Sequence, residues 1–519
     1  EKVSAFADTL ENELKSQEGF NSITSIPSYS KVWISDVMKN WESSFDSIDG
    51  GFNYVPKFPM PNNLLSILHY ALFMENSSIM AHFNKTLLKM SYGGLYDQVK
   101  GGFSRYSTDA IWKVPHFEKM LYDNAQLIEL YSEGYNATQN KEYKEVVYKS
   151  FHWLNSELKT EYGSYLCSQD ADSEGVEGAF YCWEEEELRS LLKSDFDWFK
   201  EYYNISFGKI WEEERYILYR DKSFAEFAKS KGWSNAEFQP KLDRALHILS
   251  ETRALRKPPS IDTKSLCSWN ALLIKGLCKA YVFFEDEVFL ESAKEIASWI
   301  NKYQINPDSS IHHNFVKGKA SIDGFLEDYA FVIEAFILLY QVSRDLEFLE
   351  TAKNLAEKVE SDFNSIEHGL YYFSNSNSKL ITRKIDVEDD VMPSSNSVMA
   401  HCYYQLGVYY RIDDWITRSH NMLSIVLKNI EKSPMAYSNW FLLYLKLSQS
   451  NTEITILNDD SVSVGALKHL IHPFKTISYH ETIPMSNGFL EGIYVCKDKT
   501  CLPKINSVED LLIKLNRND

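Results

Sequence analysis

The sequence predicts a mainly α protein in which paired helices close into a ring around a funnel, followed by a small α/β segment. Apolar residues recur at intervals of three and four from about residue 62 to about residue 450, as in amphipathic helices. Short stretches rich in glycine, aromatic residues and carboxylates separate these helices. Beyond residue 451 the sequence changes to β-branched runs such as TEITIL, which are typical of strands, and ends in one more helical stretch.

Five segments show the helical pattern most clearly, and several are apolar enough to be buried on most faces: 64–73, 125–135, 271–284, 329–343 and 397–410. The stretches between them resemble one another, as in GGLYDQ at 93, SSIHHNF at 309 and HGLYYFS at 368. A helix pair followed by a short extended loop is typical of a helical hairpin array. Because the spacing is irregular and the polar loops all follow helix ends, we expect a closed ring rather than an open solenoid.

Composition excludes several classes of partner. With 519 residues, 44% of them apolar, the chain is long enough to bury a large core. The formal charge of −19 argues against nucleic acid or an anionic membrane as a partner, since either requires a basic surface. No apolar run approaches the roughly 18 residues of a membrane span. Neutral, cationic and sugar-like ligands remain possible.

The seven cysteines contain no CxxC pair, which fits reduced thiols in a cytoplasmic protein. Cys496 and Cys501 are the one close pair, and their spacing would allow a disulfide or half of a metal site. With no second pair nearby, we expect neither. We expect no metal and no cofactor elsewhere in the chain.

Residues 93–124 combine glycines, aromatic residues, one histidine and several carboxylates with little aliphatic content, so we expect the site to include them. Pro115 is expected to start a helix, with His116 and Glu118 in its first turn and Tyr122 and Asp123 about one turn later. Histidine is the natural proton carrier near neutral pH, and a neighbouring carboxylate can fix its tautomer. The alternative is a buried polar network that only locks the loop to the helix.

Three further stretches carry candidate residues. Asp170 and Asp172 suit proton transfer better than calcium binding, because the twelve-residue calcium loop pattern is absent. Trp269 beside Asn270 offers a stacking face and a bidentate amide, although a brace at a helix start is nearly as good an explanation. Carboxylates that lead into an apolar helix, as Asp328 does, are hard to explain as solvated surface.

These arguments give two sets of expected site residues. The expected catalytic residues are His116, Glu118, Asp123, Asp170, Asp172 and Asp328. The expected substrate-binding residues are Arg105, Tyr106, Trp112, Tyr122, Trp269, Asn270, Glu327, Asp390 and Asn396. In GGFNYVPKFPMP, Phe52, Lys57 and Phe58 could line a cleft, but a rigid structural loop is the favoured interpretation.

Six motifs in order across residues 50–400 resemble the spermatogenesis-associated protein 20 family, whose bacterial members are usually described as thioredoxin-domain-containing proteins. They are GGFNYVPKFPMP, GGLYDQVKGGFSRYSTDAIWKVPHFEKMLYDNAQL, SQDADSEGVEGAFYCW, DTKSLCSWNALLI, DGFLEDYAF and PSSNSVMA. The resemblance implies an (α/α)6 six-hairpin toroid, similar to glycoside hydrolases and N-acylglucosamine 2-epimerases. It also implies a thioredoxin-like domain upstream of this chain. Residues 1–48 would be the entry helices and linker that follow that domain. Residues 49–450 would form the toroid, and residues 451–519 the α/β segment.

Two functions from different classes fit this prediction. The first is a carbohydrate-active or sugar-binding protein, either a glycoside hydrolase with a carboxyl pair or a sugar epimerase. In the epimerase, His116 and a second histidine such as His312 or His313 would move a proton beside a carbonyl. The second is a binding or scaffold module that presents a client to the upstream thioredoxin-like domain.

Overall fold

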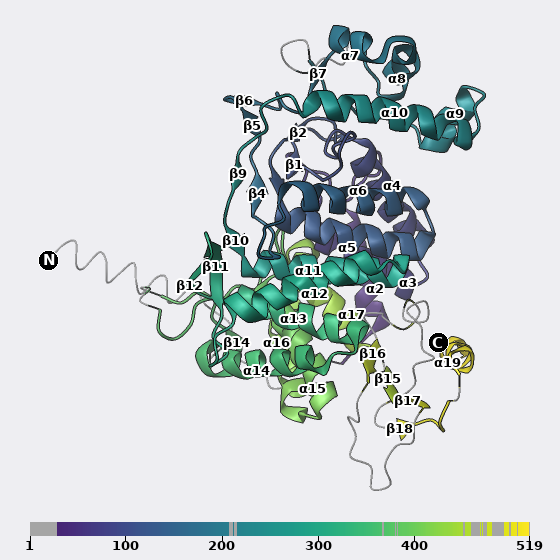
Figure 1. Ribbon diagram of the computed structural model, residues 1–519. Coiled ribbons are helices and arrows are strands. Elements are labelled where there is room, and N and C mark those ends of the chain that lie inside the picture. Colours follow the sequence, from purple (N-terminus) through teal and green to yellow (C-terminus); the bar gives the residue numbers. More distant parts are fainter. Residues whose placement is uncertain are drawn as a thin grey trace, which may run out of the picture. The chain divides into compact units, whose positions relative to one another are not determined.

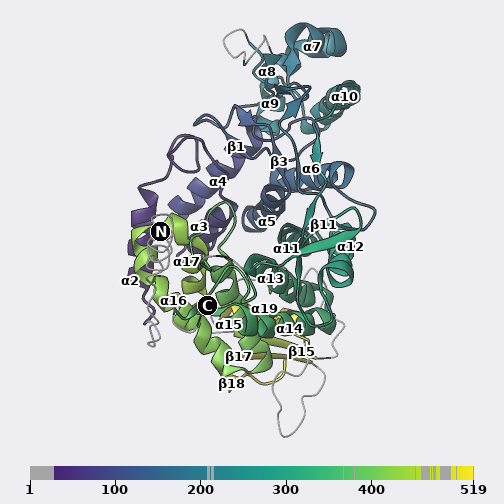
Figure 2. The same ribbon diagram turned by 90° about the vertical axis from the view of Figure 1, so that its left-hand side faces the viewer.

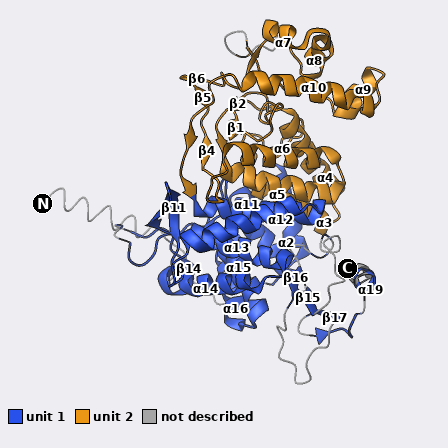
Figure 3. Cartoon of the chain, viewed as in Figure 1, with its two compact units in different colours: residues 1–43, 266–519 blue, residues 44–265 orange. Residues whose placement is uncertain are grey.

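The computed structural model describes residues 28–206, 211, 215–365, 368–378, 380, 382–449, 452–457, 468, 470, 475–479, 492–497, 500–505 and 507–517. It divides into two compact units, shown in Figure 3. Unit 1 comprises residues 1–43 and 266–519, and unit 2 comprises residues 44–265. None of the helices in the described ranges is long and apolar enough to cross a lipid bilayer.

Helical hairpins form most of both units (Figure 1). Unit 2 contains α3 (Pro61–Phe73) with α4 (Ser77–Tyr92), and α5 (Leu121–Thr138) with α6 (Lys141–Glu157). Unit 1 contains α11 (Cys267–Phe284) with α12 (Glu287–Trp299), α13 (Leu326–Ser343) with α14 (Leu346–Asp362), and α15 (Ser395–Tyr410) with α16 (Asp413–Lys432). A further pair joins distant parts of the chain, because α2 (Lys31–Glu42) lies against α17 (Ser438–Leu447) through rings such as those of Trp33 and Tyr444, 4.1 Å apart.

Three of the hairpins, α5–α6, α11–α12 and α13–α14, repeat one local solution for reversing the chain. The first helix ends at a left-handed residue, and the next residue is an Asn or Asp that caps the second helix. Gln139 has φ 59° and precedes Asn140, whose side chain accepts from the Glu142 amide. Glu285 with Asp286 and Arg344 with Asp345 repeat this arrangement. Two residues therefore suffice to make the paired helices antiparallel.

Within each hairpin the two helices are buried differently. The first, such as α13, is buried on nearly every face, whereas its partner α14 buries one stripe at spacings of three and four. The prediction of a mainly α fold built from helical hairpins, with a small C-terminal α/β segment, is therefore confirmed. Closure of the hairpins into a ring involves both units and stays a prediction, as does the proposed division at residues 48 and 450.

The chain between α6 and α11 departs from the hairpin pattern. Helices α7 (Glu185–Leu192), α8 (Phe196–Tyr202), α9 (Phe224–Ser230) and α10 (Asn235–Arg253) share an apolar cluster of their own. Short strands of unit 2 pair as β1-β2, β3-β4-β9, β5-β6 and β7-β8. Their bounds are Tyr106–Ser107, Pro115–His116, Lys119–Met120, Ser168–Gln169, Asp172–Ser173, Val176–Glu177, Trp183–Glu184, Arg215–Tyr216 and, for β9, Ile261–Asp262. The sequence pattern had suggested only helices with loops here.

The remaining strands belong to unit 1, except that β10 begins at Ser265, the last residue of unit 2. The sheet β10-β11-β12 (Ser265–Leu266, His312–Val316, Lys319–Asp323) and the pair β13-β14 (Asn364–Ser365, Leu370–Tyr371) lie between its helices in the sequence. The C-terminal sheet has the order β16-β15-β17-β18 (Lys475–Ser478, Thr452–Leu457, Gly492–Lys497, Thr500–Cys501), and α19 (Val508–Arg517) follows. Figure 2 shows this sheet beside α15, where the Tyr409 hydroxyl donates to the Ile477 carbonyl at 2.7 Å. Short 3-10 or π turns span Lys193–Asp195, Ile300–Gln304 and Pro434–Tyr437.

Cys496 and Cys501 face each other on β17 and β18 and form a disulfide. The expectation that this pair forms nothing was therefore wrong, because strand register, which the sequence did not reveal, places the two residues directly opposite. The other five cysteines are buried thiols. Burial raises the pKa of Cys267 and Cys402 well above the ordinary value, as expected for small buried hydrophobes.

The first turns of several buried helices contain an asparagine that binds a loop backbone. The Asn124 amide accepts from the Phe103 N–H at 2.7 Å and donates to the Phe103 carbonyl at 3.0 Å. Asn396 makes the same pair of bonds to Tyr371, both at 2.8 Å. Each side chain thus satisfies both backbone groups of a residue in an earlier loop. We call this arrangement the loop clamp.

A buried ion network holds the glycine-rich segment of unit 2. Asp97 accepts two hydrogen bonds from Arg253, both at 2.9 Å, and one from Lys119 at 3.0 Å. Burial opposes ionisation of Asp97, but the two cations outweigh it and lower the pKa of this carboxyl far below its usual value. The network joins the 93–103 loop to β3 and α10, so much of this segment is structural.

Replacing Asn124 with Ala is expected to destabilise the protein by about 2–4 kcal/mol, because the Phe103 N–H and C=O groups lose their buried partners. Chemical denaturation followed by circular dichroism measures the loss. Asn235→Ala is the matched control, since Asn235 is exposed at the start of α10. Equal stabilities for both variants would contradict the role of the loop clamp.

Candidate functional site

The predicted start of a helix at Pro115 is wrong. Pro115 and His116 form strand β2, which pairs with Ser107 and Tyr106 of β1, and α5 begins only at Leu121. Proline is as compatible with an edge strand as with a helix start, and pairing to β1 decided between them. His116 therefore projects from a short ribbon that precedes α5.

A cluster of unit 2 surrounds His116. Its Nδ1 lies 2.7 Å from Glu177 Oε1, and its Nε2 lies 3.8 Å from Glu118 Oε2. The ring stacks on Tyr106 with centroids 5.0 Å apart, and Tyr106 in turn contacts Phe58 at 4.8 Å. The imidazole thus bridges two carboxylates above an aromatic surface.

Arg105 extends this cluster towards α5. Its Nη1 lies 3.4 Å from Glu118, and its Nε donates to the Tyr122 hydroxyl at 3.2 Å. Asp123 lies in the first turn of α5, where Oδ2 is buried and has no hydrogen-bond partner. Burial raises the pKa of Asp123 well above its ordinary value, although Arg105 opposes the shift. The sequence prediction that these residues gather in one place is supported within unit 2.

The first turn of α13 forms a second cluster, in unit 1. Asp328 is fully buried and accepts from the backbone N–H groups of Ser268, at 3.1 Å, and Phe325, at 2.9 Å. Its Oδ2 also lies 2.9 Å from Nδ1 of His313, which projects from β11. These contacts fix the imidazole and leave its Nε2 as the outer nitrogen.

Glu327 lies next to this histidine. Burial, followed by the neighbouring Asp328, raises the pKa of the Glu327 carboxyl to about 7, and Asp386 contributes in the same direction. Burial alone would lower the pKa of His313, but the hydrogen bond to Asp328 together with the charges of Asp328 and Glu327 outweighs it and raises the pKa above the ordinary value. A carboxyl group with a pKa of about 7 and an imidazole whose pKa is raised above its ordinary value therefore lie in one cluster, as general acid and base catalysis requires.

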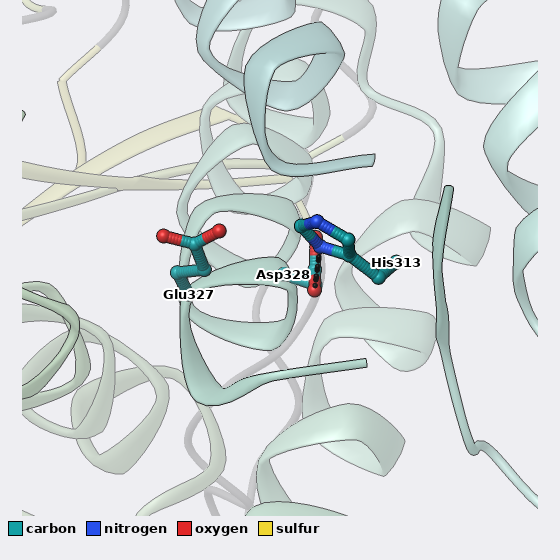
Figure 4. Close-up of side chains that lie close together, drawn as sticks. All are labelled: His313, Glu327 and Asp328. Carbon is teal, nitrogen blue, oxygen red and sulfur yellow. Dashed lines mark hydrogen bonds and ion pairs between the residues drawn. The ribbon is translucent and has the colours of Figure 1, made fainter. Parts of the chain in front are cut away.

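Among the residues that the structure describes, His313, Glu327 and Asp328 form the one cluster whose ligand atoms lie close enough to suggest a metal ion, within 4.8 Å of one another. Figure 4 shows Asp328 and His313 facing each other, while Glu327 projects in another direction from the same turn. Asp328 already binds two backbone amides and the imidazole. This arrangement orients His313 for proton transfer more readily than it encloses an ion.

Several expected site residues are structural instead. Trp112 is fully buried and donates to the Asp49 carbonyl at 2.9 Å, so it does not line a cleft. Asn270 and Asn396 are buried and bind backbone carbonyls, at 2.9 Å to Leu266 and 2.8 Å to Asp386. Asp328 is fully buried, so it positions His313 rather than touching a substrate as a catalytic group.

Other candidates remain on the surface of their units. Asp170 and Asp172 are exposed, and Asp170 accepts from Ser260 Oγ at 3.0 Å. Trp269 is half-buried in the first turn of α11, and Asp390 is exposed before α15. His116 and Asp170 belong to unit 2, and Trp269, Asp328 and Asp390 to unit 1. Their convergence at one mouth therefore stays a prediction.

The structural interpretation of the 50–61 loop is supported. Lys57 is buried and donates to Asp46 at 2.6 Å and to the Ala110 carbonyl at 2.9 Å. Phe52 is also buried, so only Phe58, beside Tyr106, reaches the His116 cluster.

Sequence reasoning left three contributors out of the expected site. Glu177 was visible in an acidic stretch, but only the β5-β6 pairing brings it to His116. Ser268 contacts Glu327 with its hydroxyl at 3.4 Å and Asp328 with its amide. Asp386 is half-buried, and burial raises the pKa of its carboxyl. No local pattern in the sequence marks Ser268 or Asp386.

Comparison with solved structures finds sugar-active proteins at low similarity. A GH76 α-mannanase of Bacteroides thetaiotaomicron is 12% identical with a TM-score of 0.47, and the match covers 80% of this chain and 95% of the mannanase. An unsaturated glucuronyl hydrolase of Bacillus sp. GL1 is 10% identical with a TM-score of 0.46, covering 80% and 94%. A sugar epimerase from a ruminal bacterium is 15% identical with a TM-score of 0.32, covering 81% and 99%.

No family model matches the chain. Spermatogenesis-associated protein 20 of Homo sapiens is 27% identical over 523 residues, which is 89% of this chain and 66% of the human protein. The Mus musculus protein of the same name is 27% identical, covering 86% and 62%. An uncharacterized protein of Caenorhabditis elegans is 26% identical, covering 91% and 71%. The resemblance drawn from the six motifs is confirmed, and the chain spans about two thirds of the length of these mammalian relatives.

Replacing Glu327 with Gln is expected to stabilise the protein at high pH only. The carboxyl pKa is raised from 4.5 to about 7, so the folded state retains a proton that the unfolded chain releases in this window. Ionised Glu327 therefore costs stability that grows from about pH 4.5 to about pH 7 and persists above it. We expect Glu327→Gln to exceed the wild type by about 1–2 kcal/mol near pH 8.5 and to match it near pH 4.5.

Thermal unfolding measured across this pH range provides the test. Glu350→Gln, at an exposed position of α14, is the control and should show no such pH dependence. A Glu327→Gln difference that is constant with pH would mean that the carboxyl is not held neutral.

Proposed function

We propose that this relative of spermatogenesis-associated protein 20 is a carbohydrate-active enzyme that moves a proton on a sugar, in the manner of an isomerase or 2-epimerase. The observation that carries the proposal is the pair formed by His313, oriented by Asp328 at 2.9 Å, and Glu327, whose pKa is about 7. An oriented imidazole beside a carboxyl group that titrates near neutrality suits proton transfer next to a carbonyl.

The proposed step begins with the open-chain form of a reducing sugar. Nε2 of His313 accepts the proton from the carbon next to the carbonyl, while the protonated Glu327 carboxyl donates its proton to the carbonyl oxygen. The products of this step are a neutral enediol, a protonated His313 imidazolium and an ionised Glu327 carboxylate, so the net charge is unchanged. Return of a proton to the carbon, on the same or the opposite face, regenerates both groups and yields the exchanged or isomerised sugar.

Hydrolysis fits the same cluster less well. A glycosidase needs two accessible carboxyl groups about 5–5.5 Å apart for retention or about 6.5–9.5 Å apart for inversion. Asp328 is fully buried and bound to His313, so it cannot reach a glycosidic bond or a water molecule on the substrate. Glu327 and Asp386 are the remaining carboxyl groups of this cluster, but a reaction on that pair would give the oriented imidazole of His313 no role, so the arrangement favours proton transfer over glycoside cleavage.

The surroundings support a polyhydroxylated ligand. Near Glu327 lie the carboxyl group of Asp386 and the Ser268 hydroxyl, which offer acceptors and a donor to a ligand. In unit 2 the His116 cluster combines Arg105 and Glu118 with aromatic rings in the same way. Mixed donors and acceptors beside aromatic faces are typical of sugar binding.

Solvent exchange measures this chemistry without knowledge of the product. We expect the protein to incorporate deuterium from D2O at C2 of at least one of D-glucose, D-mannose, N-acetyl-D-glucosamine and cellobiose, observed by proton NMR. His313→Gln and Glu327→Gln should slow exchange by about 10²–10⁴-fold, the usual contribution of a general acid or base. His312→Gln is the matched control, because His312 contacts Asn306 at 3.2 Å and lies outside the Asp328 contact.

The other outcomes separate the remaining functions. Release of glucose from cellobiose without exchange would favour a glycoside hydrolase. Neither exchange nor cleavage, with no thermal shift for any of the four sugars, would favour the scaffold that presents a client to an upstream thioredoxin-like domain. A cytoplasmic location also belongs to the proposal: the five buried thiols fit it, the Cys496–Cys501 disulfide counts against it, and cell fractionation decides.

A further inference from the structure

Strand β12, opposite His313, contains an unusual backbone conformation. Ile322 has φ 61°, in the left-handed region, and among the described residues it is the one β-branched side chain with a positive φ. A branched Cβ crowds the backbone in this region, so the conformation persists only where the surrounding structure imposes it. The other positive-φ residues include helix-ending positions such as Gln139 and Glu285, where the left-handed turn has a clear structural use.

The strain lies at the position of the catalytic histidine. In the hairpin of β11 and β12, His312 pairs with Asp323 and Asn314 pairs with Ser321, so the register carries the backbone of Ile322 past His313 between these two pairs. The chain then continues through Gly324 to Glu327, so the hairpin connects the two proton-transferring residues.

Folding alone does not account for an isoleucine at this place. Its side chain is 55% exposed, so burial contributes little, and its strand neighbours Ser321 and Asp323 are exposed as well. Glycine or asparagine would adopt φ 61° at lower cost. A strained and exposed apolar residue beside an acid and base pair points to a contact made with a ligand.

We propose that Ile322 contacts the apolar C–H face of a sugar bound at His313 and Glu327, and that it contributes to substrate selection. The inference rests on the proposed function. It adds a specificity residue on β12 to the acid and base of that site. Because the contact is apolar, it strengthens binding of the sugar without taking part in the proton transfer.

Three variants separate strain from contact. Ile322→Gly removes both, so its melting temperature should rise by about 2 °C, while KM for the exchanging sugar of the four named above should rise about 5–10-fold at unchanged kcat. Ile322→Ala loses the side chain but keeps a strained Cβ, so KM should rise without the same gain in melting temperature. Lys317→Gly is the matched control, because Lys317 has φ 50° at the exposed turn of the same hairpin and should gain stability with unchanged KM.

Each outcome bears on the proposal. A wild-type KM in Ile322→Gly, with exchange intact, would overturn the role of Ile322 and leave the proposed function standing. A fall in kcat with constant KM would also overturn it, since it would show that the strain positions His313 instead. Absence of exchange in the wild type with all four sugars would overturn both proposals together.

Discussion

The loop clamp is the interaction on which the rest of this architecture depends. An α-helix leaves its first N–H groups without internal partners, and the loop that approaches it brings further unsatisfied backbone groups. Asn124 and Asn396 supply partners for the second set of groups, by binding both backbone groups of Phe103 and of Tyr371. The loops can therefore be buried against helix ends, where glycine and aromatic residues fix their course. Without the clamp the polar backbone of these loops would oppose packing.

The candidate site of unit 1 uses the same kind of position with a charge in it. Asp328 lies in the first turn of α13 and binds backbone amides of Ser268 and Phe325, much as the clamp asparagines bind theirs. A carboxylate there has capacity for a third partner, and His313 supplies it. Structural capping and orientation of the imidazole are thus served by one buried group, which explains why such an apolar helix begins with acidic residues.

Sequence reasoning succeeded where a pattern spans many residues and failed where one strand pair decides. The helices around 271–284 and 329–343 follow from apolar spacing, and their short connections follow from Asx capping. Pro115 was misassigned because a two-residue strand leaves no periodic signal, and its partner Ser107 is not marked in the sequence. Asn270 and Asn396 were assigned to a ligand because the sequence does not distinguish an asparagine that faces a cleft from a buried asparagine that binds the backbone. Glu177 was overlooked because it looks like an ordinary surface carboxylate in the sequence, and only the β5-β6 turn brings it to His116.

The sequence by itself determined the mainly α class, the hairpin pattern and the six motifs that relate the chain to spermatogenesis-associated protein 20, because each depends on local spacing or on contiguous residues. It also marked the acidic residues at the start of the helix around 329–343, whereas the histidines that join them lie on short strands that it did not reveal. Only the tertiary structure decided which carboxyl is buried as a positioning group, Asp328, and which is half-buried with a pKa near 7, Glu327. Two adjacent acidic residues look alike in the sequence. Their burial and partners differ because two backbone amides and the His313 imidazole enclose Asp328, whereas Glu327 receives only the Ser268 hydroxyl from the start of α11.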